Sequence, residues 1–270
     1  MNTKFLTVPG GQLAYDDTET PGPVVLCVNG MGETRGVYRF LRPRLVAAGY
    51  RVITTDLRGC GESTAKWDDY STVAVAGDLI TLARAITTEP VTLIVHSYTG
   101  GPGFQVAARA PESFAALVLI DSVARPQPKM PFYLRPAAWF VSHFAMGWVG
   151  YWSSLFKTVK PDDFAEYRAM LTANLREPGR MPALAAMMAD PQQAGADAAP
   201  SVRCPVLVLM GTKDTDFPDP TDEARATAAM VPDGRFQMIE ESGHYPQVEF
   251  PDAVAAAVVP FLARPEVLGK

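Results

Sequence analysis

Short apolar runs alternate with longer amphipathic stretches along the chain. Continuous apolar runs are typical of strands that are buried on both faces of a sheet. The strands predicted from these runs are Val24–Val28, Arg51–Thr55, Thr92–Val95, Leu117–Ile120 and Val206–Met210, with Arg235–Ile239 as the last. Near the start, Thr3–Val8 and Gln12–Tyr15 alternate apolar and polar residues, which predicts a half-exposed hairpin turning at Gly10-Gly11.

The stretches between these runs carry the spacing of amphipathic helices. The predicted helices are Val37–Ala48, Val73–Ile86, Gly101–Arg109, Thr221–Met230 and Asp252–Leu262. Pro260 argues against a regular end to the last of them. Strands that alternate with helices are joined by right-handed crossovers, so we predict an α/β fold with a mostly parallel central sheet flanked by helices.

Residues Ser122–Pro200 interrupt this alternation, and they are too many for an ordinary connection. Prolines divide the segment into helix-like pieces that are rich in aromatic residues. We predict a helical cap over 122–200, inserted after the strand that ends near Asp121, and a core domain formed by 1–121 and 201–270. The aromatics Trp139, Phe140, Trp148 and Trp152 either line an apolar substrate pocket or pack the cap onto the core.

Within the predicted cap, Pro136–Phe156 carries no charged residue and approaches the ~20 residues that a membrane span needs. It contains a histidine, three serines and two glycines, so we predict no stable span and leave contact with a membrane surface open. The first residues lack the long apolar core of a signal peptide, which favours a cytoplasmic protein.

Composition narrows the class of function. The chain has 270 residues, of which 48% are hydrophobic and 20% charged, so a folded domain is expected rather than disorder. A net charge of −5 leaves no basic footprint for nucleic acid. The three cysteines, Cys27, Cys60 and Cys204, form no paired motif, and neither a disulfide framework nor a zinc site is expected.

The candidate chemistry lies at the ends of predicted strands, where α/β sheets bind ligands. Ser97 follows the strand Thr92–Val95 at a strand-to-helix turn that would expose its hydroxyl as a nucleophile. The flanking positions 95 and 99, usually glycine, are Val and Thr here, so the turn should be more crowded, with Gly100 and Gly101 relieving it. The alternative is that the Ser97 hydroxyl merely caps a helix.

An acid and a base follow two later strands. Asp214 could accept the ring N–H of a histidine and fix its tautomer, with Asp216, Asp219 and the strand-end Asp121 as rival acids. His244, between glycine and Tyr245-Pro246, is the candidate base. Of the other two histidines, His96 should point away from the serine, and His143 falls in the cap.

The glycine-rich turn Asn29–Gly32 follows another strand and would let a backbone N–H face the serine. With the N–H of Tyr98 it would form an oxyanion hole. No Gly-Lys-Ser/Thr follows it, so a phosphate loop is excluded.

At these positions the chain resembles the α/β-hydrolase superfamily, whose triad runs Ser, acid, His along the chain. Asp56–Ser63 looks like the family's Asp-x-Arg-Gly-x-Gly-x-Ser turn, which is mainly structural. Asn29-Gly30-Met31 is similar to its His-Gly-x oxyanion segment, which implies the N–H of Met31 as the second donor. Family dehalogenases and epoxide hydrolases carry aspartate where Ser97 stands, so both are disfavoured.

We therefore expect a serine hydrolase that cleaves an ester, thioester or related acyl bond of an apolar small molecule through Ser97, His244 and Asp214. Asn29 and Tyr245 are further pocket candidates. No metal or cofactor is expected, and the chain is predicted to be a monomer or homodimer. Three alternatives remain: a cofactor-independent dioxygenase, a C–C bond hydrolase and a non-catalytic ligand binder.

Overall fold

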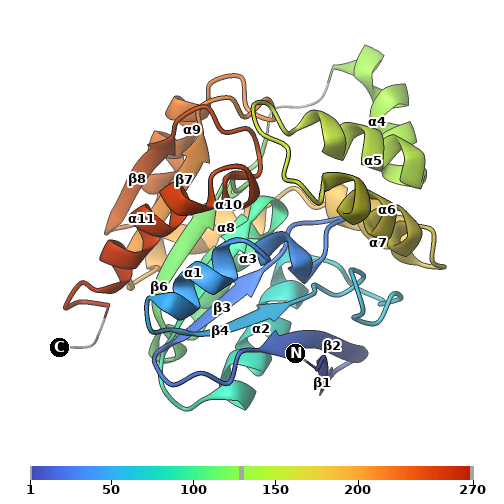
Figure 1. The fold of residues 1–270 in the computed structure, drawn as a ribbon. Coiled ribbons are helices and arrows are strands. Elements are labelled where there is room, and N and C mark those ends of the chain that lie inside the picture. Colours follow the sequence, from blue (N-terminus) through green and yellow to red (C-terminus); the bar gives the residue numbers. More distant parts are fainter. Residues whose placement is uncertain (1, 128–130, 268–270) are drawn as a thin grey trace.

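The computed structural model describes residues 2–127 and 131–267, which form an eight-stranded sheet covered by helices (Figure 1). The strands are β1 Lys4–Val8, β2 Gly11–Asp17, β3 Val24–Val28, β4 Arg51–Thr55, β5 Val91–His96, β6 Phe114–Ile120, β7 Val206–Gly211 and β8 Gly234–Ile239. Their spatial order is β1-β2-β4-β3-β5-β6-β7-β8. Every pair from β4 to β8 is parallel, whereas β2 runs antiparallel to β1 and β4. The predicted fold class is confirmed.

β3 shows why the central strands read as continuous apolar runs. Successive side chains of a strand point to opposite faces of the sheet. Val24, Leu26 and Val28 therefore join the hydrophobic core on one face, and Val25 and Cys27 join the core on the other. Because helices cover both faces, all five side chains are buried.

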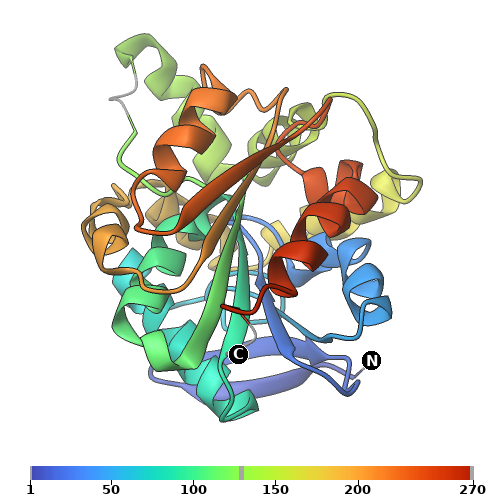
Figure 2. The same ribbon diagram turned by 90° about the vertical axis from the view of Figure 1, so that its left-hand side faces the viewer.

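Two groups of helices cover the sheet, one on each face (Figure 2). On the face of Val25 lie α1 Leu41–Ala47 and α11 Pro251–Leu262, which pack together. On the opposite face lie α2 Thr72–Ile86, α3 Gly100–Arg109 and α9 Pro220–Ala228.

Two helix predictions need correction. The predicted helix Val37–Ala48 is divided into a 3-10 turn, Arg35–Tyr38, and the shorter α1. Pro43 falls in the first turn of α1, where its missing N–H costs no hydrogen bond. α11 continues through Pro260, which had argued against a regular end.

A turn after β4 fastens that strand to α2. The Arg58 guanidinium pairs with the Asp78 carboxylate of α2 through two contacts of 2.7 Å, and it stacks on the Trp67 ring. Gly61 adopts φ +52°, and a Cβ there would lie 2.1 Å from the Asp56 carboxylate. These contacts serve to hold the loop in shape.

A helical insert lies between β6 and β7, at the end of the sheet where β5 reaches Ser97 (Figure 1). It contains the 3-10 turn Phe132–Leu134, α4 Arg135–His143, α5 Ala145–Ser154, α6 Phe164–Leu175 and α7 Arg180–Met188. α8 Gln193–Ala198 falls within the predicted cap but packs on α3 of the core. Gly195 and Gly101 allow this approach, since a Cβ on Gly195 would lie 2.4 Å from the Gly101 Cα.

The uncharged segment Pro136–Phe156 is divided between α4 and α5, which meet at the extended residue Phe144. The two helices have 9 and 10 residues, well short of the ~20 residues of a membrane-spanning helix. Within the described parts of the chain, no helix combines the length and the apolar character that crossing a bilayer requires.

Candidate active site

Ser97 occupies the sharp turn between β5 and α3. Its φ of +56° lies in the left-handed region, which costs a residue other than glycine on the order of 1–3 kcal/mol. The Thr99 hydroxyl closes the turn: it donates to the His96 carbonyl at 2.7 Å and accepts from the His96 N–H at 3.0 Å. A strand, a strained turn and a helix thus follow one another as a nucleophile elbow requires.

Val95, at the other position where glycine is usual, packs against α3. A Cβ on Gly103 would lie 3.3 Å from Val95 Cγ2, so the missing side chain at 103 makes room for the valine. Gly100 and Gly101, which were expected to relieve the crowding, instead face Ser122 and Gln192. That expectation was wrong, because the helix turns Gly103 toward Val95.

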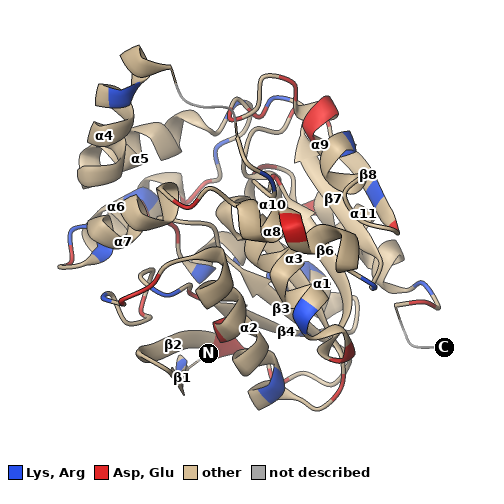
Figure 3. Cartoon of the chain, turned by 180° about the vertical axis from the view of Figure 1, so that it is seen from behind, with Lys and Arg blue, Asp and Glu red and all other residues tan. Residues whose placement is uncertain are grey.

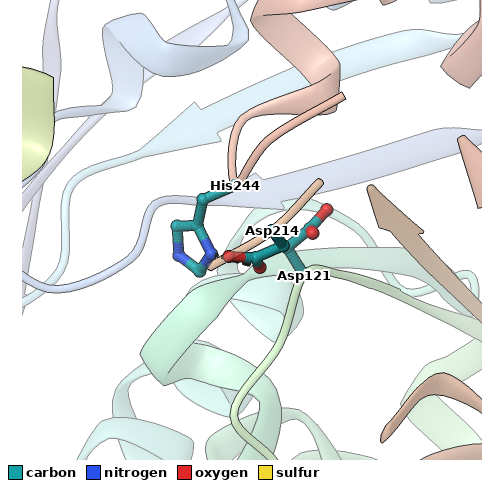
Figure 4. A group of neighbouring side chains, drawn as sticks. All are labelled: Asp121, Asp214 and His244. Atoms are coloured by element: carbon teal, nitrogen blue, oxygen red, sulfur yellow. Dashed lines mark hydrogen bonds and ion pairs between the residues drawn. The ribbon is translucent and has the colours of Figure 1, made fainter. Parts of the chain in front are cut away.

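His244 and Asp214 come from the loops after the neighbouring strands β8 and β7 (Figure 4). The His244 Nδ1–H donates to Asp214 Oδ2 at 2.7 Å, and both residues are buried. Burial alone would lower the pKa of His244, but the carboxylates of Asp214 and Asp216 outweigh burial and raise this pKa to about 10. Burial opposes ionisation of Asp214, yet the charge and hydrogen bond of His244 hold the pKa of Asp214 below its usual value.

Two of the rival acids occupy different settings. Asp216 Oδ2 lies 3.6 Å from His244 Nδ1, and Asp216 Oδ1 accepts the Tyr151 hydroxyl of α5 at 2.5 Å. Asp219 caps α9 by accepting the Asp222 N–H at 3.0 Å. Asp214 therefore makes the shorter bond to the ring, and Asp216 is a second carboxylate beside it.

Asp121, the third rival, lies behind Asp214. It is fully buried, and its Oδ1 accepts the Gly211 N–H at 2.9 Å. Burial and the nearby Asp214 charge raise the pKa of Asp121 well above its ordinary value. Asp121 therefore supports the loop after β7, and its burial favours the uncharged form of its carboxyl group.

Asp121, Asp214 and His244 are also residue types that ligate metals, and one ligand atom of each lies within 4.8 Å of the others. A histidine ligand must present a nitrogen lone pair. Here the Nδ1 that faces the carboxylates is protonated and donates to Asp214 at 2.7 Å. The set fits a hydrogen-bonded acid–base pair better than a metal centre.

The turn after β3 lies directly against the serine. A Cβ on Gly30 would stand 2.9 Å from Ser97 Cβ, so a side chain there would displace Ser97. Asn29 Nδ2 donates to the carbonyls of Gly30 and Glu33, both at 2.8 Å, and Asn29 Oδ1 accepts the Leu57 N–H at 3.0 Å. Asn29, a predicted pocket candidate, is fully buried and braces the turn.

Two backbone N–H groups near Ser97 face no protein acceptor, one in the turn after β3 and one in the turn after β5. Among the described residues, neither the N–H of Met31 nor that of Tyr98 donates a hydrogen bond to another protein group. The Tyr98 side chain is directed into the core, where its hydroxyl donates to the Tyr70 carbonyl at 2.7 Å. Both N–H groups are therefore available to an oxyanion.

Ser97 and His244 line one small cavity beneath the insert. The other lining residues are Gly30, Met31, His96, Trp148, Tyr151, Leu155, Asp216 and Tyr245. Only about 10 Å³ is open to the centre of a water molecule, which is room for about one water. No hydrogen bond joins the Ser97 hydroxyl to the His244 ring among the described residues, and such contacts commonly tighten only when substrate binds.

The predicted pocket aromatics divide into three groups. Trp148 and Tyr245 line the cavity. Trp152 is buried behind them and meets the Tyr245 ring edge-on at 6.1 Å. Trp139 and Phe140 lie on the outer side of the insert, 55% and 39% exposed, and do not line the cavity.

His96 was expected to point away from the serine, but its ring lies beside that of His244, with centroids 4.9 Å apart. Its Nε2–H donates to the His244 carbonyl at 2.8 Å. Burial lowers the pKa of His96 to about 3, so the ring is neutral. The positive φ of Ser97 interrupts the alternation of strand side chains, which explains why the expectation was wrong.

Sequence reasoning also missed the contacts that tie the insert to the turn after β3. Trp148 Nε1–H donates to the Gly32 carbonyl at 2.8 Å, Trp152 Nε1–H to Glu33 Oε2 at 2.8 Å, and the Tyr167 hydroxyl to Glu33 Oε1 at 2.6 Å. Glu33 is buried, and burial raises its pKa against the opposing effect of these donors. An isolated glutamate in a turn gives no sequence signal for this role.

Comparison with known proteins places these observations in context. A family model described as "Alpha/beta hydrolase family" matches residues 25–257. "Putative non-heme bromoperoxidase BpoC" of Mycobacterium tuberculosis is 27% identical over 258 residues, covering 93% of this chain and 97% of that protein. A thermophilic esterase from Thermogutta terrifontis superposes with a TM-score of 0.77 at 27% identity, over 97% of this chain and 98% of the esterase.

A third similarity is one of fold. The enol-lactonase from Burkholderia xenovorans superposes with a TM-score of 0.79 at 22% identity. The superposition covers 97% of this chain and 100% of the lactonase chain.

Proposed function

The chain belongs to the alpha/beta hydrolase family, and we propose that it is a serine hydrolase acting on an ester, thioester or related acyl bond. One observation carries the proposal: the 2.7 Å bond between His244 and Asp214 lies beside a cavity that Ser97 enters from a strained turn. The similarity to a thermophilic esterase along nearly the whole chain supports the reaction class.

In the proposed mechanism, His244 Nε2 takes the proton of the Ser97 hydroxyl as Oγ attacks the substrate carbonyl. Asp214 holds the ring through Nδ1 and stabilises the imidazolium. The C–O or C–S bond of the substrate then breaks, and the leaving group departs with the proton from His244. Water gives a proton to His244 and attacks the acyl group, which releases the acid and restores Ser97.

The oxyanion formed at each attack would accept hydrogen bonds from the N–H groups of Met31 and Tyr98. Each donor of this kind can contribute about 3–4 kcal/mol to the stability of the transition state. Gly30 makes this geometry possible, since its lack of a side chain lets the turn reach Ser97.

The lining of the cavity favours an apolar acyl group. Met31, Trp148 and Leu155 contribute apolar surface, whereas the Asp216 carboxylate would repel an anionic substrate. We therefore expect uncharged acyl or aryl esters of moderate bulk to be hydrolysed faster than esters of small charged acids. A substrate panel with the reverse preference would refute this part of the proposal.

The test is labelling with a fluorophosphonate probe, which reacts fast only with an activated serine. The unaltered chain and the control variant Ser154→Ala, changed at an exposed serine of α5, should be labelled and should hydrolyse an activated ester. Ser97→Ala should do neither. Turnover that survives in Ser97→Ala would refute the mechanism, and oxygen consumption by that variant with an aromatic substrate would indicate the dioxygenase alternative.

A further inference from the structure

The outer side of the insert exposes an unusual concentration of large apolar side chains. Seven residues between 132 and 146 are each at least 39% exposed: Phe132 81%, Tyr133 68%, Leu134 45%, Trp139 55%, Phe140 39%, Phe144 46% and Met146 71%. We call this surface the aromatic ridge. Single exposed apolar residues are ordinary on proteins, but a contiguous group marks an interaction site.

The ridge is a built structure with one covered side. α4 packs on α5, where a Cβ on Gly147 would lie 2.8 Å from the Phe140 ring. Along the ridge, the Trp139 and Phe144 rings meet edge-on at 5.6 Å, and Phe140 stacks on Phe144 at 5.2 Å. The inner side of α4 is thus used for packing within the insert, and its outer side remains exposed.

The charge around the ridge differs from that of the whole protein. Between residues 132 and 146 the sequence has a single charged residue, the exposed Arg135, in a chain whose net charge is −5. In Figure 3 the ribbons of α4 and α5 carry no acidic colour, and the basic residue on α4 is Arg135. A surface that combines exposed aromatics with an exposed arginine and no carboxylate is complementary to an anionic, partly apolar partner.

We propose that the aromatic ridge docks on the surface of an anionic phospholipid bilayer. Trp, Tyr and Phe side chains settle at the depth of the headgroups, and Arg135 faces the lipid phosphates. α4 has 9 residues, so it lies in the plane of the interface. A second copy of the chain is the weaker candidate, because a two-fold contact between ridges would place both Arg135 side chains at one interface with no carboxylate of the ridge to pair with them.

The test is flotation of the full chain with vesicles, which needs no enzymatic readout and so is independent of the proposed function. Vesicles of phosphatidylcholine and phosphatidylglycerol should bind the chain, and vesicles of phosphatidylcholine alone should bind it at least about tenfold more weakly. Added salt should weaken the binding to anionic vesicles, because it screens the charge.

Two variants locate the contact. The double variant Phe132→Ser/Tyr133→Ser and the single variant Arg135→Glu should each reduce binding by about tenfold or more. The matched control Phe5→Ser/Phe236→Ser removes two exposed aromatics elsewhere, 51% and 39% exposed, and should bind as the unaltered chain does. Hydrolysis of a water-soluble ester should not change in the ridge variants.

Three results would overturn the proposal. They are absence of binding to anionic vesicles, equal loss in the control variant, and a dimer in sedimentation velocity that the ridge variants dissociate. Arg135→Glu leaves every apolar side chain of the ridge in place, so it decides the question even if the double variant folds poorly.

Discussion

Asp216 is expected to set the pH at which the enzyme becomes active. Its carboxylate lies 3.6 Å from His244 Nδ1 and adds to the charge of Asp214 in raising the pKa of His244. A general base must be unprotonated, so kcat/KM should rise with pH until His244 loses its proton. Asp216→Asn removes the charge but keeps an oxygen that can accept the Tyr151 hydroxyl.

The size of the effect follows from the geometry. Unit charges about 4–5 Å apart interact by about 3–4 kcal/mol at an effective dielectric constant of about 20. Burial raises the pKa of Asp216 and so opposes its charged form, and for this reason we expect an interaction smaller than this value. We expect Asp216→Asn to lower the pKa of His244 by about 1–2 units, since one unit corresponds to about 1.4 kcal/mol.

The assay is the pH profile of kcat/KM for an uncharged ester, with hydrolysis monitored by titrating the acid that is released. The rising limb should move to lower pH by about 1–2 units, which makes the variant about tenfold or more faster near neutrality. Asp219→Asn, which removes an acid that caps α9, should leave the limb in place. A limb that stays put or moves to higher pH in Asp216→Asn would refute the reasoning.

Three further predictions concern packing. Asp78→Ala should lower the free energy of unfolding by about 3–5 kcal/mol in urea denaturation, because it leaves the buried Arg58 charge without its partner; a change below about 1 kcal/mol would contradict this. Glu33→Gln should cost about 1–3 kcal/mol in the same measurement, because one amide nitrogen must face a donor where an oxygen now accepts; an unchanged midpoint would argue against this reading. Gly30→Ala should reduce kcat/KM by about 100-fold with little change in Tm, because the methyl group would displace Ser97; near-normal turnover would count against the close approach.

The fold was largely predictable because one physical rule governs the central strands. A strand covered on both faces must be apolar throughout, and β3 is a clear example. The place of α8 was not predictable, because its packing on α3 depends on two glycines, Gly195 and Gly101, that are 94 positions apart in the sequence. The break near Arg39 in the predicted helix Val37–Ala48 was not predictable either. The 3-10 turn before the break is capped by Thr34, and no local sequence pattern marks where that turn ends.

The contact between Asp214 and His244 was predictable, because the positions of their loops decide it. Asp214 and His244 each follow a parallel strand, and neighbouring parallel strands end at one edge of the sheet. The cavity wall could not be predicted in the same way. All the aromatics of the insert look alike in sequence, and only the packing of α4 and α5 places Trp148 of α5 in the cavity wall and leaves Trp139 of α4 exposed. The roles assigned to Ser97 and its partners stay predictions until they are tested.

The lack of free space beside Ser97 has a kinetic consequence. Any molecule larger than water must wait for the wall of Trp148, Tyr151 and Leu155 to move before it meets the hydroxyl. The rate at which a serine-directed reagent inactivates the protein should therefore level off as the reagent concentration rises. The limiting rate should equal the rate at which the wall of the cavity opens. Two reagents of unequal intrinsic reactivity should show the same limiting rate. Access to the cavity, which precedes any covalent step, would then decide which molecules react.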